Sequence, residues 1–287
     1  MIYPKYLVYI TKLEVYPNQF GYTYLQCATT KRKEMTPDEY VLSLVSNYSV
    51  STGSGSAAFQ AAQKLYPTIK GWAGKYLLSA TFSGSYAKST TIKGGTDVDI
   101  FISLDSQTPG TLKEIYENLY SYLDDKHLSP RRQNVSIGLS YSGVSIDLVP
   151  GRKQAGNTSD HSLYRNKANT WTQTNVGKHI ELISESGRLV EIKALKIWRK
   201  VHYLDFPSFY LELTILDALY NKKKNQPASN VWTVIEYLRD SFSKARVVDP
   251  ANSNNIISDD LTSAEKGSIV SVAKNSVAQA NWGSIIW

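Results

Sequence analysis

Two aspartates that alternate along an apolar segment are the residues of this chain best suited to chemistry. Asp97 and Asp99 stand in the run TDVDIFI over residues 96–102. A strand points alternate side chains to one face, so we expect both carboxylates to project together while Val98 and Ile100 face a core. Neighbouring carboxylates repel each other unless a cation lies between them. Because hard cations take carboxylate oxygens, the pattern predicts two Mg²⁺ ions, with Mn²⁺ as the alternative.

A third carboxylate follows later in the chain. Asp147 lies in the apolar run 144–150, which is typical of a strand, and residues 134–141 are also strand-like. Ser142-Gly143 between them is a short turn signal, so the two runs predict a hairpin. If its second strand lies beside the first acidic strand, three acids meet on one patch. Three carboxylates with two divalent cations are the working arrangement of a two-metal phosphoryl or nucleotidyl transferase.

Simpler interpretations exist for each acid. Asp97 can cap a turn and Asp99 can be a solvated strand residue. Asp147 can be an edge-strand charge that discourages pairing with other strands. The Gly84-Ser85 turn that precedes the acidic pair favours the catalytic interpretation over these.

Together these residues resemble the active site of the DNA polymerase β-like nucleotidyltransferases. The family pattern is a helix, a Gly-Ser turn, Asp-x-Asp and a later strand Asp. It matches here as Gly84-Ser85, Asp97-Val98-Asp99 and Asp147. The resemblance implies that Asp97 and Asp99 hold both metal ions. Asp147 would bind the catalytic ion and help to deprotonate an acceptor hydroxyl, while Ser85 and the backbone near Gly84 would bind a donor triphosphate.

The second half of the chain resembles one branch of that superfamily. The runs LKIW at 195–198 and FPSFYLEL at 206–213 are similar to the helical lobe of the oligoadenylate synthetase, cGAS and DncV-like group, the CD-NTases. Residues 171–179 and the Asp-Pro…Asn loop at 248–255 agree with it, and the resemblance covers roughly residues 57–281. It implies an α+β fold, with a polymerase β-like mixed sheet lobe followed by a helical lobe.

The same resemblance implies further nucleotide-binding residues. Lys196 and Ser208 match positions that contact donor phosphates, and Tyr210 could stack on a base. From the residues alone, Lys196 is equally well a solvated helix lysine and Ser208 a helix-start hydroxyl. An aromatic residue in an apolar helix, such as Tyr210, is more often part of the core.

Composition limits the class of protein. The 287 residues carry a net charge of +7, which suits a nucleotide or nucleic-acid partner. The single cysteine, Cys27, excludes an internal disulfide and a cysteine-rich zinc site, and favours a cytoplasmic protein. No apolar run is long enough to span a membrane. Without His/Cys ligand spacing, we expect His161 and His179 to make structural hydrogen bonds.

Periodicity and capping signals place the elements. They predict a first helix capped by Thr36 with Pro37 at its first position, and a strand at 77–82. Further helices are expected at 57–76, 111–123, 190–198, 207–219, 230–242 and 262–281. We divide the chain into an extension with the first helix (1–56), a catalytic core (57–155) and a helical lobe (156–287), with the site at their junction. Met35 is a candidate true start; the alternative is an added N-terminal β-hairpin.

The resemblance predicts a function. NTPs would be joined by attack of a ribose hydroxyl on an α-phosphate, giving a cyclic oligonucleotide that a separate effector reads in bacterial antiphage (CBASS) defence. An RNA, DNA or protein activator would fit the group. The alternatives are a linear oligonucleotide synthetase or CCA-adding-like RNA-end transferase, and a catalytically silent nucleotide-binding module. Base choice, 2′–5′ or 3′–5′ linkage, product size and oligomeric state stay open.

Overall fold

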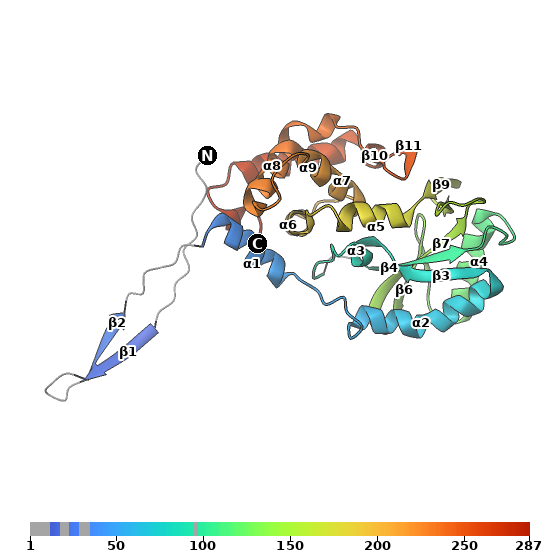
Figure 1. Cartoon of the computed structure of the whole chain (residues 1–287), viewed down its shortest axis with the longest axis horizontal. Coiled ribbons are helices and arrows are strands. Elements are labelled where there is room, and N and C mark those ends of the chain that lie inside the picture. Colours follow the sequence, from blue (N-terminus) through green and yellow to red (C-terminus); the bar gives the residue numbers. More distant parts are fainter. Residues whose placement is uncertain (1–11, 18–22, 29–34, 95–96) are drawn as a thin grey trace.

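The chain forms a sheet lobe and a helical lobe, and α5 and α6 lie on the side of the helical lobe that is nearer the sheet in the view of Figure 1. The computed structural model describes residues 12–17, 23–28, 35–94 and 97–287. No helix in these ranges is both long and apolar enough to cross a membrane.

A mixed seven-stranded sheet builds the first lobe. Its main path runs β3 (Leu77–Phe82), β4 (Val98–Leu104), β7 (Val144–Lys153), β6 (Ile137–Tyr141) and β5 (Arg131–Arg132). β4 and β7 are parallel, whereas the other neighbours on this path are antiparallel. β8 (His161–Arg165) pairs with the end of β7, and β9 (Thr170–Thr174) pairs with β8.

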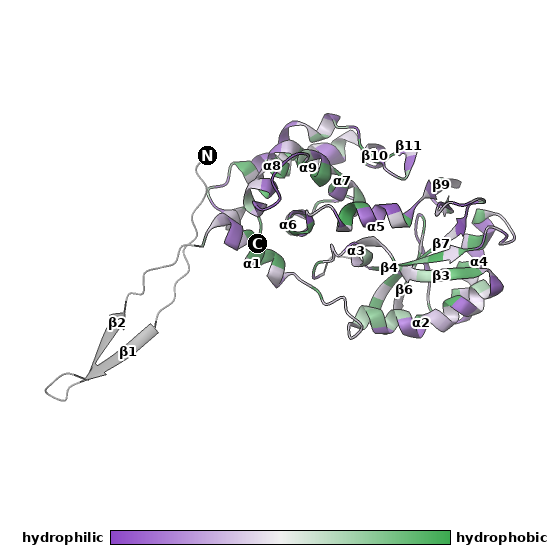
Figure 2. Cartoon of the chain, viewed as in Figure 1, coloured by the Kyte–Doolittle hydropathy of each residue, from purple (hydrophilic) through white to green (hydrophobic). Residues whose placement is uncertain are grey.

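One core lies between this sheet and two helices, α2 (Ala57–Ala73) and α4 (Leu112–Asp125). Both helices place apolar side chains against the strands, whose green colour in Figure 2 marks their hydropathy. Ile100 of β4 and Leu148 of β7 belong to this core. Because side chains alternate along a strand, the residues beside them, Asp99 and Asp147, face the opposite side of the sheet.

The second lobe packs helices around its own apolar core, which includes Trp198, Tyr210 and Phe242. Its helices are α1 (Pro37–Asn47), α5 (Val176–Ser184), α6 (Leu189–Val201), α7 (Ser208–Ala218), α8 (Pro227–Asp240) and α9 (Ser263–Val277). Strands β10 (Val248–Asp249) and β11 (Asn252–Ile256) form a small ribbon, and short 3₁₀ turns span Gly74–Tyr76, Phe242–Lys244, Ile257–Asp260 and Trp282–Ser284. In the sheet lobe, the one-turn helix α3 (Gly84–Ala87) lies between β3 and β4 in the sequence.

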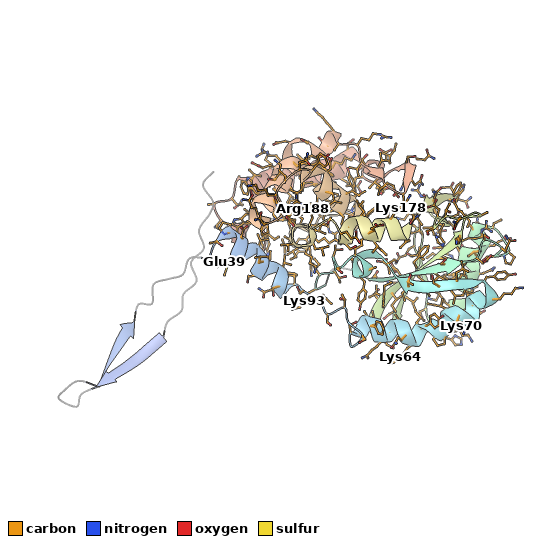
Figure 3. All side chains as sticks on the ribbon, viewed as in Figure 1. Glu39, Lys64, Lys70, Lys93, Lys178 and Arg188 are labelled. Carbon is orange, nitrogen blue, oxygen red and sulfur yellow. The ribbon has the colours of Figure 1, made fainter. Side chains whose placement is uncertain are left out.

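Charged side chains divide between surface and interior. Lys64 and Lys70 on α2 and Lys178 on α5 are exposed (Figure 3). Arg188 is buried in the helical lobe, where it donates hydrogen bonds to the carbonyl oxygens of Leu219, Lys222 and Lys223. A buried cation that satisfies the free carbonyls after α7 fixes the chain between α7 and α8.

Most expected elements are present close to their predicted bounds. Thr36 caps α1, and Thr262 caps α9 with Glu265 in a capping box. Trp198 is fully buried, as expected of a core residue. The alternative for the N-terminus is also seen, since β1 (Lys12–Pro17) and β2 (Thr23–Ala28) pair antiparallel, apart from both lobes in Figure 1. Other residues before Met35 lie outside the described ranges, and the proposed start at Met35 stays a prediction.

Two expected domain limits need correction. The boundary at residue 155 falls inside the sheet, because β8 and β9 extend it to Thr174. The first helix, α1, is not part of a separate extension, because Val41, Leu44 and Val45 are buried against α6 and α8 of the helical lobe. An amphipathic helix joins whichever core accepts its apolar face, so its position in the sequence did not identify its partner.

Candidate active site

The three predicted aspartates meet on one wall of a cavity between the lobes. Asp99 and Asp147 are register partners on the parallel strands β4 and β7, and Asp97 directly precedes β4. All three line a cavity of about 260 Å³ together with Gly84, Ser85, Lys88, Ser208, Phe209 and Glu212. The sequence therefore identified both the acids and their convergence.

The Gly-Ser turn is built against the same strand. Gly84 has a φ of 54°, a conformation that only glycine adopts at little cost. The backbone N–H of Ser83 donates to the carbonyl oxygen of Asp99 at 2.9 Å. The hydroxyl of Thr91 donates to Ser85 Oγ at 3.2 Å. These contacts hold the turn beside the acidic strand, so a group bound at Ser85 would lie next to the carboxylates.

Burial and, to a smaller extent, mutual repulsion disfavour the charged forms of Asp99 and Asp147. Burial raises the pKa of Asp99 to about 6, while Lys88 opposes the rise and Asp97 adds to it. Burial also raises the pKa of Asp147 to about 6, and the charges of Asp97 and Asp99 add to the rise. A raised pKa means that the charged form of the carboxylate is disfavoured. Binding of a cation beside these carboxylates is therefore favourable.

Gln133 is a site residue that the sequence analysis missed. Its Nε2 donates to Asp147 Oδ1 at 2.8 Å, and its Oε1 accepts from Ser136 Oγ at 2.9 Å. Both bonds fix which way the amide points. Gln133 therefore orients one carboxylate oxygen of Asp147 and partly offsets the rise in its pKa.

Other residues that line the cavity supply positive charge and an aromatic ring. Lys88, which follows α3, places its Nζ 4.2 Å from the centre of the Phe209 ring. Ser208 begins α7, and its Oγ accepts a hydrogen bond from Arg199 Nη1 at 3.0 Å. A cation, a hydroxyl and a ring that line the same cavity as three acids suit a ligand with phosphates and a planar base.

Two predicted nucleotide ligands do not line this cavity. Lys196 is 2% exposed and its Nζ lies 2.6 Å from Glu212 Oε1, so it stands behind the wall, and Lys88 is the lysine that reaches the cavity. Tyr210 is fully buried against Phe206 and Phe242 in the helical core. A stacking role for Tyr210 does not fit this structure, because its side chain is fully buried; the ring of the neighbouring Phe209 lines the cavity instead.

A second, more apolar hollow of about 190 Å³ adjoins the first. It shares Gly84, Lys88, Asp99 and Phe209 with the cavity and continues below α5 to Phe101, Val149, Leu163, Thr174, Val176 and Ile180. His179 also lines it, with its ring 4.4 Å from that of Phe209 and its Nε2 2.7 Å from Asp249 Oδ1. His161 bonds Ser103 and the carbonyl of Ser159. Both histidines make the structural hydrogen bonds that were predicted.

The donor set suits a hard cation that arrives with its substrate. Among the described residues, no group of three or more His, Cys, Asp or Glu side chains is close enough to hold a metal ion by itself. Mg²⁺ usually keeps several waters and takes one or two carboxylates together with substrate phosphates. Asp97, Asp99 and Asp147 offer only oxygen ligands on an open wall, which fits that mode of binding.

Known proteins with this architecture share very little sequence with the chain. No protein-family model matches it, and no curated protein matches it. CdnC of E. coli MS115-1, solved with ATP, superposes with a TM-score of 0.69 at 18% identity, covering 84% of this chain and 90% of CdnC. The CD-NTase CdnG of Bradyrhizobium diazoefficiens, in complex with GTP, gives 0.66 at 14% identity, covering 84% and 91%.

A third structure with this fold is the CdnE cyclic dinucleotide synthase of Elizabethkingia meningoseptica, solved with GTP and Apcpp. It gives a TM-score of 0.65 at 13% identity, covering 84% of this chain and 99% of CdnE. CdnC has also been solved in a complex with HORMA-deltaN, which matches this chain at 0.67 and 17% identity, covering 83% and 88%. The predicted α+β fold, a polymerase β-like sheet lobe followed by a helical lobe, is thus confirmed.

Proposed function

We propose that this chain is a metal-dependent nucleotidyltransferase that joins NTPs. A ribose hydroxyl would attack an α-phosphate, forming a new phosphodiester bond and releasing pyrophosphate. The observation that carries the proposal is the cavity itself, which is lined by Asp97, Asp99 and Asp147 together with Lys88, Ser208 and the Gly84-Ser85 turn.

The residues that line the cavity would have different roles. Ser85 and Ser208 would bind phosphate oxygens by hydrogen bonds, and Lys88 would compensate their charge. Asp97, Asp99 and Asp147 would hold two Mg²⁺ ions, or Mn²⁺, which when bound stabilise charge on the attacking and leaving oxygens. Gln133 would keep Asp147 oriented, and Phe209 would offer its ring to a base. The protein would contribute chiefly position and charge compensation.

The product is proposed to be a cyclic oligonucleotide second messenger, read by a separate effector in antiphage defence. This rests on the fold shared with CdnC, CdnG and the cyclic dinucleotide synthase CdnE, whose structures contain ATP, GTP or an NTP analogue. A protein activator is proposed on the same ground, because CdnC forms a complex with HORMA-deltaN. A cytoplasmic location is proposed from the single cysteine.

The test is synthesis from labelled NTPs. The purified protein is incubated with all four NTPs and Mg²⁺ or Mn²⁺, and products are treated with phosphatase and resolved by mass spectrometry. The Asp97→Ala/Asp99→Ala variant should give none. Asp124→Ala/Asp125→Ala, which removes two exposed acids at the end of α4, serves as the matched control and should retain synthesis.

The outcomes separate the functions that compete. Phosphatase-resistant products that need Asp97 and Asp99 establish a cyclic oligonucleotide synthase and identify its bases. Linear products that depend on added RNA indicate an oligonucleotide synthetase or RNA-end transferase, and that dependence should fall steeply with salt. Nucleotide binding with no product, in the presence of RNA, DNA and both metals, would contradict the proposal and favour a silent binding module.

A further inference from the structure

Four polar side chains from both lobes form one buried network behind the cavity. Glu212 of α7 accepts from Lys88 Nζ at 2.9 Å through Oε2, and its Oε1 lies 2.6 Å from Lys196 Nζ. Thr90 completes the network, because its hydroxyl donates to Glu212 at 3.0 Å and accepts from Lys196 at 2.7 Å. Lys88 and Thr90 come from the segment after α3, whereas Lys196 and Glu212 come from the helical lobe.

The position of the network beside the cavity indicates a role other than stabilising the fold. Buried ion pairs are often no more stabilising than apolar side chains of similar volume. The network contains two lysines and one carboxylate, and both lysines also interact electrostatically with Asp99. Lys88 and Glu212 both line the cavity that holds the three aspartates. The carboxylate of Glu212 is thus paired with Lys88, the only lysine among the described residues that lines that cavity.

We propose that Glu212 is an internal counter-ion. It pairs with Lys88 while the site is empty, and a substrate triphosphate takes its place at Lys88 when it binds. The inference rests on the proposed function and adds a residue that sets affinity for the triphosphate without contacting the reacting atoms. Glu212 is therefore a positioning residue. It weakens binding of phosphate by competing for Lys88, and it keeps Lys196 paired while the site is empty.

The geometry supports competition in particular. Lys88 Nζ contacts only one oxygen of Glu212 and lies over the Phe209 ring, so it can turn toward the cavity without leaving the aromatic face. Lys88 also lies near enough to Asp99 to lower the pKa of that carboxyl. Lys196 and Thr90 stay bonded to the other oxygen, Oε1, and would retain Glu212 when Lys88 departs.

The test measures binding without chemistry. Dissociation constants for inorganic tripolyphosphate and for adenosine are measured by calorimetry, without metal, for the native chain and for Glu212→Gln. The amide keeps the size of the side chain and removes its charge. We expect tripolyphosphate to bind about tenfold more tightly to Glu212→Gln, as removal of a competing charge at this range allows. Adenosine affinity should change less than twofold.

Two further variants separate a counter-ion from a structural role. Glu212→Asp keeps the charge and should not gain affinity for tripolyphosphate. Glu191→Gln is the matched control, because Glu191 is an equally buried carboxylate, bonded to Arg188 and Asn230, that does not line the cavity. It should change thermal stability and leave both dissociation constants unaltered.

Other results of these measurements would contradict the inference. Unchanged or weaker tripolyphosphate binding by a folded Glu212→Gln variant would overturn the inference. So would failure of both the native chain and the variant to bind tripolyphosphate. Should Glu212→Gln fail to fold, Glu212→Asp decides: a gain in affinity with the charge retained would contradict a counter-ion. Because these measurements need no turnover, the inference and the proposed synthesis of oligonucleotides can fail independently.

Discussion

The α-carbon of Gly84 faces the carboxylate of Asp99 so closely that a β-carbon on residue 84 would overlap Asp99 Oδ2. The same residue has a φ of 54°, which disfavours any side chain. The turn and β4 are therefore packed so closely that the Asp99 side chain leaves no space for a β-carbon on residue 84. A side chain at this position would push the carboxylate out of the cavity.

Gly84→Ala should for that reason abolish synthesis, with a loss on the order of 100-fold or more, as misplacement of a reacting group by about 1 Å can cause. Product formation from labelled NTPs measures the loss. Gly74→Ala is the matched control, since Gly74 has the same φ of 54° and a β-carbon there would meet nothing within 4 Å. It should lose about 1–2 kcal/mol of stability and keep its activity. Equal losses in both variants would show that backbone strain alone is responsible.

The burial of Asp147, together with its repulsion by the neighbouring acids, should be visible as a stability change in the metal-free protein. The folded pKa of Asp147, about 6, lies above its ordinary 3.8. Stability from this group is therefore fully present below pH 3.8 and is lost as the pH rises through about 6. Asp147→Asn should raise the melting temperature at pH 8, by about 2–4 °C for each kcal/mol relieved, and have little effect near pH 4.

Thermal unfolding of both proteins across that pH range measures the difference. Asp124→Asn removes an exposed carboxylate for comparison and should show no such trend. A gain that is as large at pH 4 as at pH 8 would mean that packing, and not charge, is responsible. Activity should be lost in Asp147→Asn at every pH.

Gln133 should affect rate more than binding. Gln133→Leu removes the hydrogen bond to Asp147, so we expect kcat to fall about tenfold, the lower range for groups that orient metal ligands, with KM nearly unchanged. Loss of a bond that lowers the pKa of Asp147 should also move the acid limb of the pH–rate profile to higher pH. Gln154→Leu removes a comparable amide bond, to Ser162, away from the cavity and should leave the profile in place. A change in KM alone would contradict an orienting role.

The two neighbouring aromatic residues of α7 should behave oppositely. Phe209→Leu is expected to weaken NTP binding by about 1 kcal/mol, a typical value for an aromatic pair, because this ring lines the cavity. Tyr210→Phe should not alter NTP binding. The buried Tyr210 hydroxyl has no hydrogen-bond partner among the described residues, so its removal should leave stability unchanged or raise it. Fluorescence titration with an NTP and thermal unfolding test both, and the reverse ranking would restore Tyr210 as the stacking residue.

Phe209 and Tyr210 illustrate what could not be predicted from the sequence. Strand periodicity was enough to place Asp97 and Asp99 on one face, and a hairpin signal was enough to bring Asp147 into the sheet. In contrast, α7 carries apolar residues on all sides, so periodicity does not determine which of Phe209 and Tyr210 faces the core. Adjacent helical residues differ by about 100° in direction, and only the packing of the lobe decides between them.

Lys88, Gln133 and strands β8 and β9 were missed for related reasons. Lys88 ends a single helical turn, which has no periodic pattern. Gln133 follows β5, and it lies near Asp147 because β5 pairs with β6 and β6 pairs with β7. β8 and β9 are short and partly polar, and they belong to the sheet through pairing with the end of β7. In each case the information lies in tertiary contacts between segments that have no local signal.

The network around Glu212 also limits how the lobes can move. It joins Lys88 and Thr90 of one lobe to Lys196 and Glu212 of the other through contacts of 3.0 Å or less. Separation at this point would leave buried charges without partners, at a cost of several kcal/mol. The contacts of Thr90 with Glu212 and Lys196 would keep the two lobes joined at this point even when Lys88 turns away from Glu212.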